Sequence, residues 1–343
     1  MSLGVTYFDA IKGPGIVTSQ WSEASGFSGG TINGIKTEKK GWEISLSGTP
    51  VKSGNFSWNT AVNWSTYVER YKEFYNGLTF LNGGYLGADS RVSYKIGDRV
   101  DNLYGYKFFR APDGQIIHDN SGVILNDNRK AQLLGHSNPD YVWSFINTIS
   151  YKSFSLNFQF DGRVGGVGVD YVYKKLLQGG REISTVQGAY GAARLAEFNQ
   201  NPNNDPNNIP QTYTGQGVVA SGPLELDANG NPTNLNQLTF TPNTVKSSLQ
   251  DYIGREVGFD ERVLISSTFA KLRQVTISYN IPTAVLKKSG LRQASISLVG
   301  RNLLYFAKRT DIDLDQFIGG NLGAQILQSP TLRRYGVNIN LTF

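Results

Sequence analysis

The chain contains no cysteine among its 343 residues, and charged residues make up only 17% of it. The absence of cysteine excludes disulfide frameworks and thiolate metal sites, and it is compatible with an oxidising envelope compartment. No run of about 20 apolar residues is present, which excludes a transmembrane helix. The first residues carry neither the basic nor the apolar segment of an export signal. An export signal therefore lies upstream of a truncated chain, or the protein is cytoplasmic.

Chemistry-bearing patterns are also scarce. The formal charge is +6, and the basic residues are scattered rather than gathered in a stripe, so the electrostatic footprint of a nucleic-acid-binding protein is missing. The only histidines, His118 and His136, lack metal-ligand spacing and triad partners, and we interpret them as solvated loop residues. The glycine-rich stretch 162–168 lacks the Lys-Ser/Thr that completes a phosphate-binding loop. We therefore predict that the protein is not an enzyme and has no nucleic-acid partner.

The strongest pattern that the sequence does contain is alternation with a period of two residues. In the segment 335–343, every second residue is apolar, and the residues between are glycine, asparagine or threonine. Because successive strand residues point to opposite faces, such a strand has one apolar and one polar face. Similar segments recur along the chain, and they predict eight strands, at residues 3–9, 39–49, 55–65, 140–151, 154–163, 268–281, 293–303 and 335–343.

The links between these predicted strands alternate strictly between long and short. The long links are 10–38, 66–139, 164–267 and 304–334, and the short ones are 50–54, 152–153 and 282–292. In an up-and-down arrangement, all long links leave one end of the sheet, as in outer-membrane β-barrels with short periplasmic turns and long extracellular loops. Strand lengths near 9–11 residues also suit a bilayer. A soluble sandwich would show the alternation within strands but would produce this asymmetry only by chance.

Several local signals refine this picture. Pro50 is predicted to end a strand, because proline cannot donate to the ladder. Residues 188–198 favour a short helix, and residues 284–288 favour a single helical turn. The alternating carboxylates Asp311, Asp313 and Asp315 could bind a cation, but we favour a solvated acidic edge.

Aromatic residues fall into two groups. One group lies near the ends of predicted strands, where the aromatic girdles of membrane barrels form, and consists of Trp42, Phe56, Trp64, Trp143, Tyr151 and Phe154. The other group lies in the long links and could stack on sugars or peptides, or could simply pack the loops together; it consists of Tyr104, Tyr106, Phe108, Tyr171 and Tyr173.

Collinear motifs span nearly the whole chain: a hairpin at 41–43 and 56–59, a Tyr-Gly-Tyr loop at 104–106, a Gly/Pro loop at 135–141, a turn at 151–154, a strand at 267–282 and a segment at 300–303. Together these motifs resemble the SusC/RagA family of TonB-dependent outer-membrane transporters. The corresponding patterns of that family are "KGxE…FSW", "YGY", a Gly/Pro loop, "YK-x-F", "SF-x-RLRNVTLGYNLP" and "G-x-NL".

The resemblance implies an all-β fold: about eight antiparallel strands from the C-terminal part of a larger transmembrane barrel of roughly 22 strands. The plug domain and the first barrel strands would be absent, and 66–139 and 164–267 would be long extracellular loops. The implied function is TonB-dependent import of oligosaccharides or peptides across the bacterial outer membrane. The implied partners are membrane lipid, a SusD-like surface lipoprotein, and TonB through the missing N-terminal part.

Two further points follow from the resemblance. The last strand resembles the signal read by the outer-membrane insertion machinery, through its apolar residues Tyr335, Val337, Ile339, Leu341 and Phe343. The Asp/Gly-rich stretch of the family is degenerate here, at 113–114 and 119–122, and lacks the spacing of a calcium loop, so we predict no metal site or cofactor and keep Ca²⁺ as an open alternative. The alternative function is a self-contained β-rich domain for glycan binding or adhesion.

Overall fold

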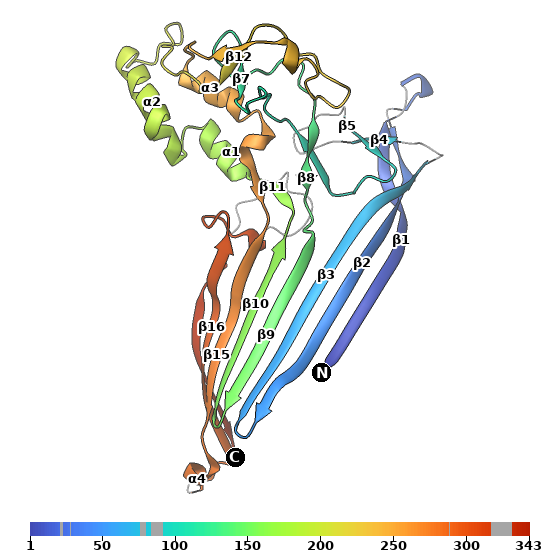
Figure 1. Cartoon of the computed structure of the whole chain (residues 1–343), viewed down its shortest axis with the longest axis vertical. Coiled ribbons are helices and arrows are strands. Elements are labelled where there is room, and N and C mark those ends of the chain that lie inside the picture. Colours follow the sequence, from blue (N-terminus) through green and yellow to red (C-terminus); the bar gives the residue numbers. More distant parts are fainter. Residues whose placement is uncertain (21–22, 28, 76–79, 84–91, 288, 317–330) are drawn as a thin grey trace.

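The computed structural model describes the whole chain except residues 21–22, 28, 76–79, 84–91, 288 and 317–330. A long, curved antiparallel sheet forms the body of the molecule, and a folded cap sits at one end of it (Figure 1). The eight strands of this sheet are hydrogen-bonded in chain order. They are β1 (Ser2–Gln20), β2 (Gly29–Ser53), β3 (Phe56–Phe74), β9 (Tyr141–Tyr151), β10 (Phe154–Val164), β15 (Phe269–Asn280), β16 (Gln293–Ala307) and β17 (Arg334–Thr342).

All eight predicted strands are present, and the up-and-down order is confirmed. The short connections lie at the end of the sheet away from the cap (Figure 1). In the hairpin between β9 and β10, Tyr151 is paired with Phe154, and Lys152 adopts a φ of 51° in the tight turn. Between β15 and β16, the predicted helical turn is confirmed as α4 (Thr283–Leu286).

The prediction of a long link at 10–38 is wrong, because β1 continues to Gln20 and β2 begins at Gly29. Apolar residues do not alternate with polar ones in this region, so the sequence pattern that marks the other strands is missing here. Ion pairs across the ladder accompany the extension instead: Lys72 lies 2.7 Å from Glu38, and Lys36 lies 2.9 Å from Glu73. A charged, solvated ladder between β2 and β3 therefore extends these two strands beyond their apolar part.

The prediction that a strand ends at Pro50 is also wrong. Strand β2 continues to Ser53, with a shift of register between Gly48 and Val51, after which Val51 lies opposite Trp58. A bulge leaves one residue of the strand out of the ladder, so a proline that has no N–H to donate is tolerated there.

The cap is built from the two longest connections, β3 to β9 and β10 to β15. The helix predicted at 188–198 is confirmed as α2. The strands of the cap region are β4 (Phe80–Gly83), β5 (Val92–Lys95), β6 (Asn102–Gly105), β7 (Ile117–His118), β8 (Gln132–His136), β11 (Val167–Val169), β12 (Val218–Ala220), β13 (Phe240–Pro242) and β14 (Leu264–Ser266). Its main helices are α1 (Tyr171–Gln178), α2 (Gly188–Gln200) and α3 (Leu249–Glu256), with short 3₁₀ turns η3 (Ile183–Val186), η4 (Leu235–Gln237) and η5 (Asp260–Val263).

The two connections of the cap fold against each other rather than separately. Strand β7 of the first pairs in parallel with β12 of the second, with Ile117 opposite Val218. Ile124 from the first connection is fully buried in one core with Tyr252 and Phe259 from the second. The short elements η1 (Glu23–Ser25) and η6 (Leu314–Gln316) lie in the remaining connections. No helix in the described part of the chain is long and apolar enough to cross a membrane.

Candidate functional site

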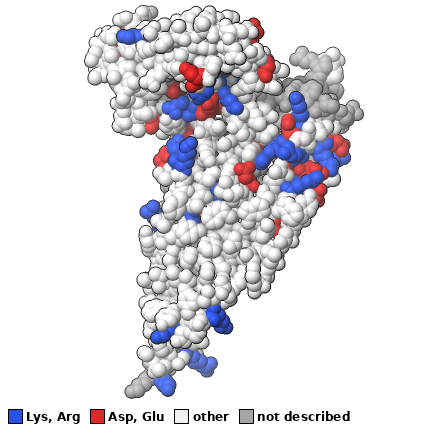
Figure 2. Space-filling view, viewed as in Figure 1, with Lys and Arg blue, Asp and Glu red and all other residues white. Residues whose placement is uncertain are grey.

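Residues opposite each other on neighbouring strands share a face of the sheet. The paired rows show that one face of this sheet is apolar and the other is polar. One row of the apolar face joins Ile339 to Ile296, Ile296 to Tyr279, and Tyr279 to Phe154. One row of the polar face joins Ser45, Asn63, Ser144 and Asp161. Charged side chains gather near the cap and at the opposite tip, and the broad band between them is nearly free of charge on the face in view (Figure 2).

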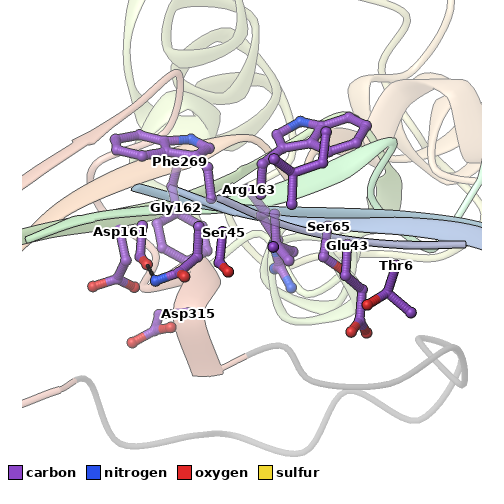
Figure 3. A pocket seen from close by; sticks show the side chains of 16 residues that line it. Thr6, Glu43, Ser45, Ser65, Asp161, Gly162, Arg163, Phe269 and Asp315 are labelled. Atoms are coloured by element: carbon purple, nitrogen blue, oxygen red, sulfur yellow. Dashed lines mark hydrogen bonds between the residues drawn. The ribbon is translucent and has the colours of Figure 1, made fainter. Parts of the chain in front are cut away.

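The polar face is hollowed where β1, β2, β3, β9 and β10 curve, and the hollow encloses about 560 Å³. Figure 3 shows Thr6, Glu43, Ser45, Ser65 and Asp161 on the same side of these strands, with Asp315 facing them from below. These groups are hydroxyls or carboxylates, which form hydrogen bonds with water or with a polar solute. Apolar residues, among them Val142 and Phe269, also line the hollow, so it offers both polar and apolar contacts to a solute.

Few of the polar side chains that line the hollow form hydrogen bonds with one another. The Asn63 amide donates a hydrogen bond of 3.0 Å to the Ser144 hydroxyl. Glu43 makes no ion pair with any described residue, although its carboxylate points into the hollow (Figure 3). Nothing in this set pairs a nucleophile with a base, so the arrangement suits contact with a passing solute rather than chemistry on it.

A charged network borders the hollow on the side nearest the cap. We call residues 308–316, which follow β16 and fold back over the polar face, the latch. The Lys271 ammonium on β15 lies 2.7 Å from Asp313 and 3.1 Å from Asp315 of the latch. The Arg273 guanidinium lies 2.6 Å from Asp315 and donates a 2.7 Å hydrogen bond to Asp161 on β10. One residue of the latch thus bridges two cations of the wall.

An apolar contact anchors the latch between these ion pairs. Leu314 is 1% exposed and packs against Ile265 and Phe269, with Tyr305 beside them. The backbone N–H of Leu314 donates a hydrogen bond of 2.9 Å to the Tyr305 hydroxyl, and Arg163 donates to the Leu314 carbonyl. The latch is therefore held by burial and by charge together.

The electrostatics of the latch carboxylates reflect the same contacts. Burial acts to raise the pKa of Asp313, but hydrogen bonds from Lys271 and Thr331 outweigh it and hold that pKa below its ordinary value. Burial likewise acts to raise the pKa of Asp315, and hydrogen bonds from Arg273 and Lys271 reverse the effect. The reading of Asp313 and Asp315 as a solvated acidic edge is wrong, because the chain supplies their counter-ions.

The five loop aromatics proposed to bind substrate do not meet at one site, and none of them lines the hollow. Tyr106 stacks under the Arg129 guanidinium at 3.9 Å, Phe108 packs on Phe259 with ring centres 4.9 Å apart, and the Tyr173 hydroxyl accepts a hydrogen bond of 3.2 Å from Arg262. These three help to hold the cap together.

Of the other two aromatics, Tyr171 is exposed, whereas Tyr104 is half-buried like the first three. Tyr104 is half-buried, with its ring 6.1 Å from that of Tyr94, and Tyr171 is 39% exposed beside the Lys175 ammonium. Burial raises the pKa of the Tyr104 hydroxyl. A role in binding substrate stays a prediction for all five residues.

The reading of His118 as a solvated loop residue is wrong. Its side chain is 1% exposed, and its Nε2 lies 3.1 Å from the hydroxyl of Tyr252 on α3. The pairing of β7 with β12 carries it into the cap, where burial lowers the pKa of its imidazole. His136, the other histidine, lies 2.9 Å from Asp140 near the start of β9.

The six residues predicted to form an aromatic girdle all lie on the apolar face. Phe56, Tyr151 and Phe154 are direct cross-strand neighbours near the tip of the sheet. Trp64 and Trp143 are opposite each other nearer the cap, and Trp42 packs on Tyr7 at 4.8 Å. Along β9 the two rows are eight residues apart, about 26 Å at the rise of an extended strand. Their position in a membrane stays a prediction.

Strand β17 holds the residues proposed as an insertion signal. Within the part of the chain that the structure describes, it is hydrogen-bonded to β16 alone, and all nine of its residues are exposed. Tyr335, Val337, Ile339 and Leu341 share the apolar face with their partners on β16, and Phe343 follows the last residue of the strand. Recognition by an insertion machinery is not tested by this geometry.

The Asp/Gly-rich segment in the first connection forms tight turns. Asp113 accepts a hydrogen bond of 3.0 Å from the backbone N–H of Gln115, and this bond lowers the pKa of the Asp113 carboxyl. Asp119 accepts one of 2.9 Å from the N–H of Ser121. Among the described residues, no group of three or more His, Asp or Glu side chains is placed to hold a metal ion.

Sequence reasoning missed the wall side of the charged network. Lys271 and Arg273 occur at Lys-x-Arg spacing inside an otherwise alternating strand, and Asp161 ends the alternating run of β10. Charges inside a strand that is predicted to cross a membrane require partners, because an unpaired charge away from water is costly. The charged residues inside these strands therefore indicate, from the sequence alone, that a charged network lies there.

Comparisons with known proteins agree with the architecture. No protein-family model matches the chain. Two TonB-dependent receptors of Formosa agariphila, P3 and P26, are 22% and 24% identical to it over 94% and 93% of its length. The chain spans about 30% of the length of these curated relatives.

Solved structures of similar fold come from the RagAB system. A chain of the RagAB peptide transporter superposes with a TM-score of 0.60, and one of the RagAB peptide importer in the open-open state with 0.61. Both are 15% identical, and the matches cover 99% of this chain and 33% and 32% of those chains. The family of TonB-dependent receptors consists of outer-membrane transport proteins rather than enzymes. The chain therefore resembles TonB-dependent receptors in sequence, and a RagAB chain in fold, over about a third of their length.

Proposed function

We propose that the chain forms part of the wall of an outer-membrane β-barrel that imports oligosaccharides or peptides in a TonB-dependent manner. The observation that supports this most strongly is the separation of the sheet into an apolar face and a hollowed polar face. Lipid would meet the first face and the transported solute the second. Alternation of this kind is typical of transmembrane barrels, whose strands are apolar outside and polar inside.

The proposal assigns an orientation. The short connections near the tip of the sheet would face the periplasm, and the cap, with the connections 66–139 and 164–267, would lie outside the cell. The charged ladder of β1, β2 and β3, including the Lys72–Glu38 pair, would project into water beyond the bilayer. The aromatic rows at Tyr151 and Trp143 would mark the two membrane interfaces.

The proposal also places the sheet in a larger barrel. Strands β1 and β17 are the edges of the sheet, each bonded to a single neighbour. An unpaired edge cannot stay in lipid, because every backbone polar group there must be satisfied internally. Further strands would pair with both edges and close a barrel of roughly 22 strands.

Partners follow from the same proposal. The matched solved structures are described as a peptide transporter and a peptide importer, RagAB. By analogy, a SusD-like lipoprotein would cover the cap side of this chain, and TonB would act through another part of the receptor. Peptides are the substrate class that these neighbours favour, and oligosaccharides remain the other candidate.

Uptake by the full-length receptor tests the proposal through a matched pair of substitutions. Ser45 points into the hollow, and its neighbour Leu46 lies on the apolar face. A Ser45→Trp variant should reduce uptake of a labelled peptide or oligosaccharide mixture several-fold, because the indole fills part of the hollow. Leu46→Trp should leave uptake unchanged. Equal uptake by both variants at equal surface abundance would contradict a transport path along this face.

A further inference from the structure

The polar wall beneath the latch carries an excess of positive charge. Lys271 and Arg273 on β15 supply two cations, whereas Asp161 on β10 supplies one carboxylate, which pairs with Arg273. Without the latch, Lys271 would therefore have no carboxylate partner among the described residues of the wall. Asp313 and Asp315 bring two carboxylates to this place.

The latch shows which kind of group the wall binds. Asp313 receives the Lys271 ammonium at 2.7 Å, and Asp315 receives Lys271 at 3.1 Å and Arg273 at 2.6 Å. An arginine fork next to a lysine is a strong receptor for carboxylates, because the charge-assisted hydrogen bonds are short and directional. Asp313 and Asp315 thus bind Lys271 and Arg273 in the way that a ligand with two carboxylates would.

The site is accessible from the hollow at one edge. The side chain of Lys271 is 4% exposed beneath the latch, whereas those of Arg273 and Asp315 are 29% and 21% exposed. Asp315 and Arg163 also line the hollow (Figure 3). A solute in the hollow would meet the Arg273–Asp315 pair first and the Lys271–Asp313 pair only after the first had opened.

We propose that Lys271 and Arg273 form a carboxylate-binding site on the transport wall, which the latch occupies until an acidic solute displaces Asp315 and then Asp313. The chemistry that the site recognises is a solute with two or more carboxylates, supplied by an acidic peptide or by a uronic acid oligosaccharide. The inference rests on the proposed transport function for the origin of the solute, but binding itself requires no transport.

The competition has a physical consequence. The latch is tethered to the wall by β16, so its carboxylates act at a high effective concentration, and a free monocarboxylate competes poorly. A solute with several carboxylates can replace both aspartates and gain the same charge-assisted bonds. Neutralising the latch carboxylates should therefore strengthen the binding of such solutes by removing the competitor.

Binding by the full-length receptor in detergent tests the proposal, with triglutamate and trigalacturonate as probes. Maltotriose and trialanine amide, which have no carboxylate, are the neutral controls. The double variant Asp313→Asn/Asp315→Asn should bind at least one acidic probe at least tenfold more tightly than the wild type, and the probe that gains identifies the source of the carboxylate. Adding Arg273→Gln to this background should remove at least tenfold of that affinity.

Two binding results would contradict the proposed carboxylate site. If neither acidic probe gains affinity, or if neutral probes gain as much, the wall is not a carboxylate site and the proposal is overturned. Should the double variant fail to fold, Asp315→Asn alone, which keeps the Lys271–Asp313 pair, should still strengthen binding about threefold, and no change there overturns the proposal. Loss of uptake in Ser45→Trp concerns transport, so the two proposals fail separately.

Discussion

The indole N–H of Trp58 on β3 donates a hydrogen bond of 2.9 Å to the side-chain oxygen of Asn147 on β9. Both residues lie on the apolar face, since Trp58 is opposite Ile149 and Asn147 is opposite Thr60 and Phe158. Asn147 is 1% exposed, and its Nδ2 has no hydrogen-bond partner among the described residues. The apolar face therefore contains one polar pair that is only half satisfied.

This pair predicts a non-additive result. In Asn147→Leu, the Trp58 indole loses its acceptor, and the stability of the full-length receptor should fall by about 1–3 kcal/mol. The double variant Trp58→Phe/Asn147→Leu should recover most of that loss, because neither polar partner remains. Thermal unfolding in detergent for the four members of the cycle measures the coupling. Additive losses would mean that the hydrogen bond contributes nothing specific.

The apolar anchor of the latch predicts a cavity effect. Leu314→Ala removes a side chain that is 1% exposed, and large-to-small changes of this type cost about 2–5 kcal/mol of local stability. We expect the segment after β16 to become cleavable by protease at a concentration that spares the wild type. Leu332→Ala is the matched control, since Leu332 is 66% exposed. Equal cleavage of both variants would argue against anchoring by Leu314.

Removal of Lys271, the buried cation of the wall, should cause a larger loss of stability. Lys271→Met leaves Asp313 without its strongest partner, and breaking a buried ion pair by removing one member costs about 3–5 kcal/mol. The exposed Lys308 supplies the control substitution Lys308→Met. A shift of the receptor's unfolding temperature by Lys271→Met alone is the expected outcome, and identical shifts for both variants would contradict it.

The buried histidine of the cap predicts a dependence on pH. Because burial lowers the pKa of His118 below its ordinary 6.5, the unfolded chain takes up a proton before the folded cap does. The full stabilisation is present above pH 6.5 and is lost as the pH falls through 6.5 toward the lowered value. The protection of β7 and β12 amides against hydrogen exchange, relative to the intrinsic exchange rate at each pH, should fall over that range in the wild type and less so in His118→Asn. His136→Asn should behave as the wild type does.

The strands could be predicted from the sequence wherever one side of the ladder is apolar. Strands β9, β10 and β17 begin and end within a residue or two of their expected limits, because alternation reports burial on one face. The extensions of β1 and β2, residues 10–20 and 29–38, mix glycine, threonine and isoleucine without a two-residue period, so alternation gives no signal there. Contacts between residues far apart in the chain were not predictable either, because Arg273 and Asp315 are 42 positions apart and no local pattern joins them.

The candidate site was predictable in part. Polar positions such as Ser45 and Asn63 follow directly from the alternation once the apolar face is known. The burial of His118 was not predictable, because it depends on a parallel pairing between β7 and β12, two strands that lie about 100 residues apart in the chain. The cap is therefore the part of the molecule for which sequence patterns say least.

The central claim is that one face of this sheet meets lipid and the other meets water. The chain has no cysteine, so single cysteines at Val62, Asn63, Thr276 and Ile277 can be spin-labelled in the full-length receptor, with any cysteine elsewhere replaced. In reconstituted membranes, labels at Val62 and Ile277 should be relaxed by oxygen, which partitions into lipid. Labels at Asn63 and Thr276 should be relaxed by a water-soluble nickel complex. Water accessibility at all four positions, without alternation, would contradict the account.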